Sequence, residues 1–320
     1  MEKRFDILAL GEILIDFTHN GISEQGNGLF EANPGGAVSN VLAMMNQLGH
    51  RAAFMGKVGD DIFGRLLKKT LDDLSINTEN LLVDKDVRTT LAFVANDETG
   101  DRSFSFYRNP GADMMLVEDE VNEEAILASR IFHFGTLSMT HDGVRNATKK
   151  ALQIAKDNGL LISFDPNLRE SLWDSLDVAK EQFSYGMQYC DVLKISDNEI
   201  QWFTGIEDYE EGVKLLQDTY HIPLIFLTLG RNGSRAYYKD MKVEVPAFVQ
   251  TNTIETTGAG DTFFGSVLHH VLEKGLEDLQ QSDLQEMLTF ANAAASIITT
   301  RRGALKVMPT QEEIDKITWR

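Results

Sequence analysis

Residues 255–265 read Glu-Thr-Thr-Gly-Ala-Gly-Asp-Thr-Phe-Phe-Gly, a run of small residues that leads directly into a helical pattern. The backbone N–H groups of Gly258, Ala259 and Gly260 are then expected to point out of a helix N-terminus, where such groups form a ready site for an anion. Asp261 follows and can accept a proton from a hydroxyl group beside that site. Taken alone, the same aspartate is equally well explained as a first-turn carboxylate that favours the helix dipole.

Outward from this stretch, short apolar runs alternate with helical patterns along the whole chain. The expected strands are Phe5–Leu10, Ala52–Met55, Ile131–Phe134, Leu160–Phe164, Val192–Ile195 and Leu224–Leu229. The helical patterns lie around 37–48, 61–74, 141–158, 176–189, 209–219, 258–274 and 283–301. Alternation of this kind predicts an α/β fold, with a mostly parallel central sheet that helices cover on both faces.

Two segments, about 12–33 and 87–113, do not follow this alternation of apolar runs and helical patterns. Apolar and polar residues alternate there with a period of two, as they do in strands that are covered on one face. Both segments are therefore expected to leave the main sheet and meet as a small antiparallel β lid. The exposed edges of such a lid could pair two copies of the chain in a homodimer.

Composition excludes several classes of protein. The chain has 30 Lys and Arg against 49 Asp and Glu, a formal net charge of −19, which disfavours binding to nucleic acid or to an anionic membrane surface. No run of 18 apolar residues is present, so no membrane span is expected. One Cys in 320 residues points to a reducing compartment, and we expect a cytoplasmic protein. ATP is not excluded, because backbone N–H groups can hold its phosphates.

A second glycine stretch, Asn-Pro-Gly-Gly-Ala-Val-Ser-Asn at 33–40, opens another predicted helix. The glycine pair Gly35-Gly36 allows a ligand to approach the backbone closely, and the amide of Asn40 can bind hydroxyl groups. A turn with capping residues explains the stretch equally well when it is taken alone. A third turn of this type, Gly-Lys-Val-Gly-Asp-Asp-Ile-Phe-Gly, occupies 56–64.

Together, these three stretches resemble the two signature regions of the PfkB, or ribokinase-type, sugar kinase family in order and spacing. The resemblance extends from residue 5 to about 310, and Phe-Asp-Pro-Asn-Leu-Arg at 164–169, followed by Leu172-Trp173, is similar to the fructokinase branch. It implies a single ribokinase-like domain over 1–320, with a Rossmann-like sheet. The implied activity is ATP-dependent phosphorylation of a sugar primary hydroxyl, first of all D-fructose to fructose 6-phosphate. The alternatives are a 2-keto-3-deoxygluconate kinase, another sugar kinase of the family, or a catalytically silent sugar-binding protein.

The resemblance also implies roles for individual residues. Asp261 matches the catalytic base, and Gly258, Ala259 and Gly260 match the anion hole. The residues expected at the sugar are Asp16, Gly35, Gly36, Asn40, Arg108, Asp165, Asn167 and Arg169. Those expected at the nucleotide are Lys194, Thr228, Gly230, Gly233 and Asn292.

The implied cofactors are ATP and Mg²⁺, with K⁺ as an optional third. Glu199 matches the acid that organises Mg²⁺ through water. The candidate monovalent-cation site comprises Glu255, Thr257, Ile298, Arg301 and Gly303. Glu255 stands where the family often has Asp, and Ser196 stands where it usually has Asn, so the cation contacts can differ here. His269 and His270 are adjacent and therefore expected on different faces of a helix, so no zinc site is predicted.

Overall fold

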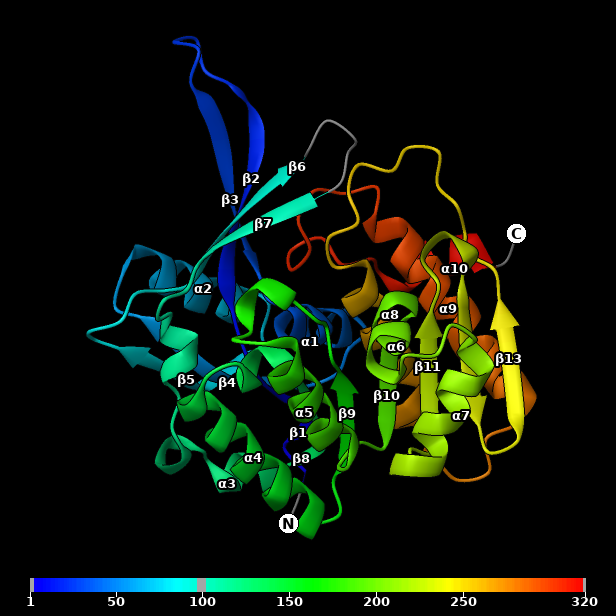
Figure 1. The fold of residues 1–320 in the computed structure, drawn as a ribbon. Helices are drawn as coiled ribbons and strands as arrows, with labels where there is room; N and C mark the ends of the chain where they lie inside the picture. Colours follow the sequence, from blue (N-terminus) through cyan, green and yellow to red (C-terminus); the bar gives the residue numbers. More distant parts are fainter. Residues whose placement is uncertain (1–2, 97–101, 319–320) are drawn as a thin grey trace.

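The computed structural model describes residues 3–96 and 102–318, and it contains one large sheet and one small sheet (Figure 1). The nine strands of the large sheet lie in the order β13-β12-β11-β10-β9-β8-β1-β4-β5. Neighbouring strands are parallel from β11 to β5, whereas β12 is antiparallel to both β11 and β13. The strands are β1 Phe5–Leu10, β4 Ala52–Gly59, β5 Asn77–Asp84, β8 Ser129–Gly135, β9 Leu161–Asp165, β10 Val192–Ser196, β11 Leu224–Thr228, β12 Ser234–Tyr238 and β13 Met241–Val245.

Helices cover both faces of this sheet, as the sequence predicts. In β1, Ile7 and Ala9 belong to the core on one face, whereas Leu8 and Leu10 belong to the core on the other. The first core receives α1 Ala37–Gln47, α2 Ile62–Asp73, α8 Ala259–Lys274, α9 Gln281–Ile298 and α10 Gln311–Thr318. The second receives α3 Glu123–Leu127, α4 Asp142–Asp157, α5 Leu176–Met187, α6 Asp197–Thr204 and α7 Tyr209–Tyr220. Because both faces are buried, the strands read as nearly continuous apolar runs.

The small sheet stands away from the main body, and its β2–β3 hairpin projects furthest (Figure 1). Its order is β3-β2-β6-β7, with β2 Leu14–Ile22, β3 Gly28–Gly35, β6 Leu91–Asn96 and β7 Arg102–Tyr107. Residues 97–101 of the predicted lid segment 87–113 lie outside the described residues.

The predicted small sheet is present, but it is mixed rather than purely antiparallel. The β2–β3 and β6–β7 pairs are antiparallel, whereas β2 and β6 run parallel. The chain passes through α1, β4, α2 and β5 between β3 and β6. A long return of this kind sets no antiparallel direction, unlike a hairpin turn, and alternation along one strand carries no information about its neighbour's direction. In the described part of the chain, no helix is both long enough and apolar enough to cross a membrane.

Candidate active site

A cavity of about 360 Å³ lies where the small sheet meets the N-terminal ends of α1 and α8. Segments far apart in the sequence therefore line one space, as expected at the carboxyl ends of parallel strands. Ten of the predicted site residues line it: Asp16, Gly36, Asn40, Asn167, Arg169, Lys194, Thr257, Gly258, Gly260 and Asp261.

The N-terminus of α8 opens onto this cavity. Its N-cap residue, Gly258, has a φ of 75° and supplies no side-chain cap. A Cβ at this position would lie 2.6 Å from the Cβ of Ala304, so glycine is required for both its conformation and its small size. Of the three predicted anion-hole residues, Ala259 donates its N–H to the carbonyl of Thr256 at 3.2 Å. Ala259 lines the neighbouring cavity, whereas Gly258 and Gly260 line this one, so the positive end of the helix faces this cavity at those two glycines.

Asp261 lies on that first turn and is buried. Its Oδ2 accepts a hydrogen bond of 2.8 Å from Nδ2 of Asn40, which lies on the first turn of α1. Burial raises the pKa of Asp261 above its usual value, although the hydrogen bond from Asn40 and the positive charges of Lys194 and Arg169 oppose the increase. A buried carboxylate with a raised pKa is a stronger proton acceptor than an exposed one, which suits a general base.

Two consecutive glycines bring α1 close to the first strands. Gly36 has a φ of 131°, and a Cβ there would lie 2.5 Å from the carbonyl oxygen of Glu12. A Cβ at Gly35 would lie 2.5 Å from Oδ2 of Asp16, so the carboxylate of Asp16 packs directly against the backbone. Oδ1 of Asn40 is buried without a hydrogen-bond partner among the described residues, and its side chain lines the cavity. The amide oxygen of Asn40 can therefore accept from a hydroxyl group, and Asp16 lines the same cavity.

Lys194 is the buried cation of the site. Its Nζ lies 3.1 and 3.0 Å from the two carboxylate oxygens of Asp165, and a Cβ at Gly260 would lie 3.0 Å from the same Nζ. Burial lowers the pKa of Lys194, but the charges of Asp165, Glu199 and Asp261 outweigh it and raise the pKa, so the ammonium stays charged. Burial also raises the pKa of Asp165 to about 7 despite its lysine partner.

Glu199 belongs to the same buried group, where it caps α6. One oxygen accepts from the N–H of Leu168 at 2.7 Å, and the other accepts from the N–H and Oγ of Ser196 at 2.9 and 2.8 Å. Burial raises the pKa of Glu199, but Lys194 and these donors outweigh it and hold the pKa below its ordinary value. The side chain is therefore a fixed carboxylate, which suits a residue that orients the water shell of Mg²⁺.

Arg108 lies beside the cavity rather than in its lining. The guanidinium donates to Oδ2 of Asp113 at 2.8 Å, to Oγ1 of Thr140 at 2.8 Å and to the carbonyl of Leu137 at 3.0 Å. Both partners of the Arg108–Asp113 ion pair have side chains that are only 2% exposed. Arg108 lines a neighbouring cavity of about 590 Å³. The sequence places Arg108 in a lid segment, but it does not predict the buried ion pair with Asp113.

A second cavity, of about 550 Å³, adjoins the first, and Thr256 lines both. Gly230 and Asn292, both predicted at the nucleotide, line this second cavity. The amide of Asn292 donates to the carbonyl of Val245 at 3.0 Å and accepts from Oγ of Ser234 at 2.9 Å. The two cavities therefore meet at the start of α8, which has the positive helix end expected of a phosphate site.

The remaining predicted nucleotide residues, Thr228 and Gly233, belong to the turn between β11 and β12. Thr228 ends β11, and Gly233 precedes β12 with a φ of 101°. A Cβ on Gly233 would lie 2.1 Å from the carbonyl oxygen of Val245, so this turn needs a residue without a side chain.

The candidate monovalent-cation residues form a loop network next to the first cavity. Oε1 of Glu255 accepts from the N–H of Gly303 at 2.8 Å, and the carbonyl of Ile298 accepts from the N–H of Arg301 at 3.0 Å. The Arg301 side chain pairs with Glu313 and donates to the carbonyl of Val307 at 2.7 Å. Carboxylate and carbonyl oxygens each have a second lone pair, so this oxygen-rich set is chemically suited to K⁺. The longer side chain of Glu255 is used here to hold the loop at Gly303.

Glu12 also lines the cavity, although its sequence context alone predicts no role for it. It is 2% exposed, and its Oε1 accepts from the N–H of Ala37 at 2.6 Å. Burial raises its pKa to about 7. The available signal is its position two residues after the buried strand β1, where side chains reach the carboxyl edge of the sheet.

Comparisons with known proteins show which family the chain is similar to. Residues 4–311 match the model of the pfkB family carbohydrate kinases. The chain is 40% identical over 309 residues to probable fructokinase-2 of Arabidopsis thaliana, covering 96% of this chain and 94% of that one. The structure of an ATP-bound fructokinase from Xylella fastidiosa superposes with a TM-score of 0.88, with 27% identity and 98% of each chain covered.

A fructokinase double mutant from Vibrio cholerae O395, solved with fructose, ADP and a potassium ion, superposes with a TM-score of 0.86, 29% identity and 99% of each chain covered. A match of the family model over nearly the whole chain and relatives of this similarity establish the family. The α/β fold with its mostly parallel sheet, the small sheet and the glycine-opened helix α8 are thus explained together: the protein belongs to the PfkB family of carbohydrate kinases.

Proposed function

We propose that this carbohydrate kinase transfers the γ-phosphoryl group of ATP to the primary hydroxyl of D-fructose, forming fructose 6-phosphate. The observation that carries the proposal is Asp261, buried in the 360 Å³ cavity at the open N-terminus of α8 and held by Asn40 at 2.8 Å. The choice of fructose is supported by similarity to fructokinases, among them the V. cholerae enzyme solved with fructose and ADP.

In the proposed reaction Asp261 accepts the proton of the sugar hydroxyl as that oxygen attacks phosphorus. The start of α8, at Gly258 and Gly260, and the ammonium of Lys194 stabilise the negative charge on the transferring group. Bound Mg²⁺ would neutralise phosphate charge, with Glu199 holding its water shell. Asp16 and Asn40 orient the sugar, and the small sheet excludes water from the cavity.

The direct test is Asp261→Asn, which keeps the shape of the side chain and removes the base. We expect kcat to fall by at least about 100-fold, the lower range for general-base catalysis, whereas the Kd for ATP changes less than threefold. Asp218→Asn, at an exposed position on α7, is the matched control and should keep wild-type kinetics. Near-normal turnover in Asp261→Asn rejects the proposed base.

One observation favours a second substrate, 2-keto-3-deoxygluconate. A sugar acid needs a cation in its pocket, and Arg169 lines the cavity together with Lys194. A panel that measures ADP release with fructose, keto-deoxygluconate, ribose and adenosine separates these activities. Fructose should give the highest kcat/KM of the panel, and a higher value for the sugar acid assigns the enzyme to the second substrate. Sugar binding without ADP release from pure protein would instead identify a silent sugar-binding protein.

We also propose that two copies pair through the small sheet and that the protein works in a reducing cytoplasm. In support of the first, Leu29 and Phe30 on edge strand β3 and Tyr107 on edge strand β7 are 47%, 50% and 64% exposed. In support of the second, Cys190 is buried and free. Light scattering of pure protein should give twice the chain mass, and Phe30→Asp should halve it.

A further inference from the structure

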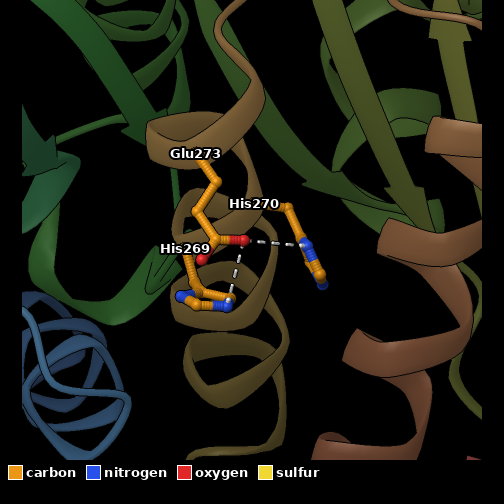
Figure 2. A group of neighbouring side chains, drawn as sticks. All are labelled: His269, His270 and Glu273. Atoms are coloured by element: carbon orange, nitrogen blue, oxygen red, sulfur yellow. Dashed lines mark ion pairs between the residues drawn. The ribbon is translucent and has the colours of Figure 1, made fainter.

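A cluster of two histidines and a glutamate occupies the last two turns of α8 (Figure 2). Nε2 of His269 lies 3.6 Å from Oε2 of Glu273, and Nδ1 of His270 lies 3.9 Å from the same oxygen. The three candidate ligand atoms all lie within 4.8 Å of one another. We propose that His269, His270 and Glu273 bind a divalent transition-metal ion of the zinc class, at a site separate from the catalytic cavity.

The spacing of the three residues explains how adjacent histidines share one site. His269 and Glu273 are four residues apart and His270 and Glu273 are three apart, so both pairs are neighbours on the helix surface. Figure 2 shows the carboxylate of Glu273 between the two rings. The two rings lie on different faces of the helix, as expected for adjacent residues, but the carboxylate of Glu273 reaches both.

The ligand distances suit a metal ion after a small closure. Zinc bonds of about 2.0–2.2 Å in a tetrahedron place neighbouring ligand atoms about 3.3–3.5 Å apart. The observed 3.6 and 3.9 Å from the carboxylate exceed these values by a few tenths of an ångström, and the two ring nitrogens, which lie within 4.8 Å of each other, must also move closer together. Glu273 has a side chain that is 56% exposed, so its carboxylate can move inward and water can complete the coordination. Two imidazoles and a carboxylate favour zinc-class ions over Mg²⁺, which prefers oxygen ligands.

A fourth residue, His50, contacts the ring nitrogen of His269 that does not face Glu273. Its Nε2 lies 2.7 Å from Nδ1 of His269. When Nε2 of His269 binds a metal, Nδ1 must carry the proton and donate it to Nε2 of His50. Metal-binding histidines generally have such a partner on their second nitrogen, because it fixes the tautomer and the ring orientation. His50 lies between α1 and β4, so its contact with His269 links the end of α8 to that loop.

The state of the two rings before binding also suits a metal. The side chain of His270 is 7% exposed, and neither ring nitrogen has a hydrogen-bond partner in the described structure. The ring nitrogens of His270 can therefore bind a metal ion without giving up a hydrogen bond. Phe290 contacts both rings at centroid distances of 5.9 and 5.0 Å and restricts their movement.

The site is remote from the proposed chemistry, although the same helix carries both. Asp261 and His269 are eight residues apart, which is about 12 Å along a helix axis. The carbonyl end of α8 attracts a cation, whereas its N-terminal end faces the catalytic cavity. A metal bound at the cluster would therefore stabilise the C-terminal end of α8 without contacting the reacting groups.

The test uses full-length protein without a histidine tag, treated with EDTA and then freed of it. Titration calorimetry should show one equivalent of Zn²⁺ bound at least 100-fold more tightly than Mg²⁺. Glu273→Gln and His269→Gln should each weaken Zn²⁺ binding at least tenfold, and His50→Phe should weaken it about tenfold through the second nitrogen of His269. Glu277→Gln, which removes the same charge at a nearby exposed position, should bind Zn²⁺ within twofold of wild type.

Two further readouts locate the ion. Co²⁺ should give the visible absorption of a four- or five-coordinate site, and Zn²⁺ should abolish it. Asp261→Asn should keep both signals, because the catalytic cavity is not involved. Zn²⁺ binding no tighter than Mg²⁺ overturns the proposal, as does a Glu273→Gln variant with wild-type affinity or an Asp261→Asn variant that loses the ion. None of these readouts depends on turnover, so the outcome is independent of the proposed fructokinase activity.

Discussion

Asn40→Ala tests how the base is positioned. Asn40 donates a hydrogen bond of 2.8 Å to the buried Oδ2 of Asp261, and that bond opposes the increase of the aspartate's pKa. A hydrogen bond to a charged group contributes about 1.5–3 kcal/mol. If the lost hydrogen bond contributes the lower of these free energies, its removal corresponds to about a tenfold increase in the proton affinity of Asp261. The variant should therefore need a pH about one unit higher than wild type to reach half of its maximal kcat/KM.

The assay measures kcat/KM for the sugar at pH values from 5 to 9. Turnover is monitored by coupled detection of ADP, with MgATP at a saturating concentration. Asn167→Gly is the matched control: Asn167 lines the same cavity and has a φ of 51°, which glycine tolerates. It should raise KM for the sugar while the acid limb of the profile stays in place. An Asn40→Ala limb that coincides with the wild-type limb refutes the assignment of Asn40 as the residue that tunes Asp261.

Three further predictions concern residues around the base. Gly35→Ala places a Cβ 2.5 Å from the carboxylate of Asp16, so KM for the sugar should rise at least tenfold while circular dichroism stays unchanged. Glu12, whose pKa burial raises to about 7, keeps its proton when folded but not when unfolded above about pH 4.5. Glu12 should thus lower the free energy of unfolding by about 3 kcal/mol as the pH rises from 4.5 to 7. Urea melts of Glu12→Gln should lack this decrease, because glutamine does not titrate. Arg108→Met leaves Asp113 unpaired in a buried ion pair, so urea melts should show a loss of about 3–5 kcal/mol, which the further change Asp113→Leu should partly restore.

Hydrophobic patterning is sufficient to predict most of the central sheet, because it depends on local sequence. The expected strands over residues 5–10, 131–134 and 192–195 are present, since both faces of the sheet are buried and the runs are apolar throughout. The hairpin of β12 and β13 goes unpredicted, because its outer residues are polar or half-exposed at the edge of the sheet. The parallel pairing of β2 with β6 is likewise unpredictable, because it depends on where the chain returns after α2 and β5.

The candidate site divides in the same way. Glycine stretches predict the starts of α1 and α8, because only glycine fits the backbone at Gly36 and Gly258. Which side chains meet across the cavity is a different matter, since Asn40 and Asp261 are separated by 221 residues. No sequence pattern shows that Asn40 faces Asp261.

The sequence by itself determined the fold class, the glycine-opened helices and the family, because these depend on local patterns and short motifs that a chain carries wherever it folds. Only the tertiary structure decided which charges are buried together. It paired Arg108 with Asp113, placed Lys194 among carboxylates and brought His50 onto His269. Burial and distance set the strength of a charge or of a metal ligand, and both are properties of the folded chain.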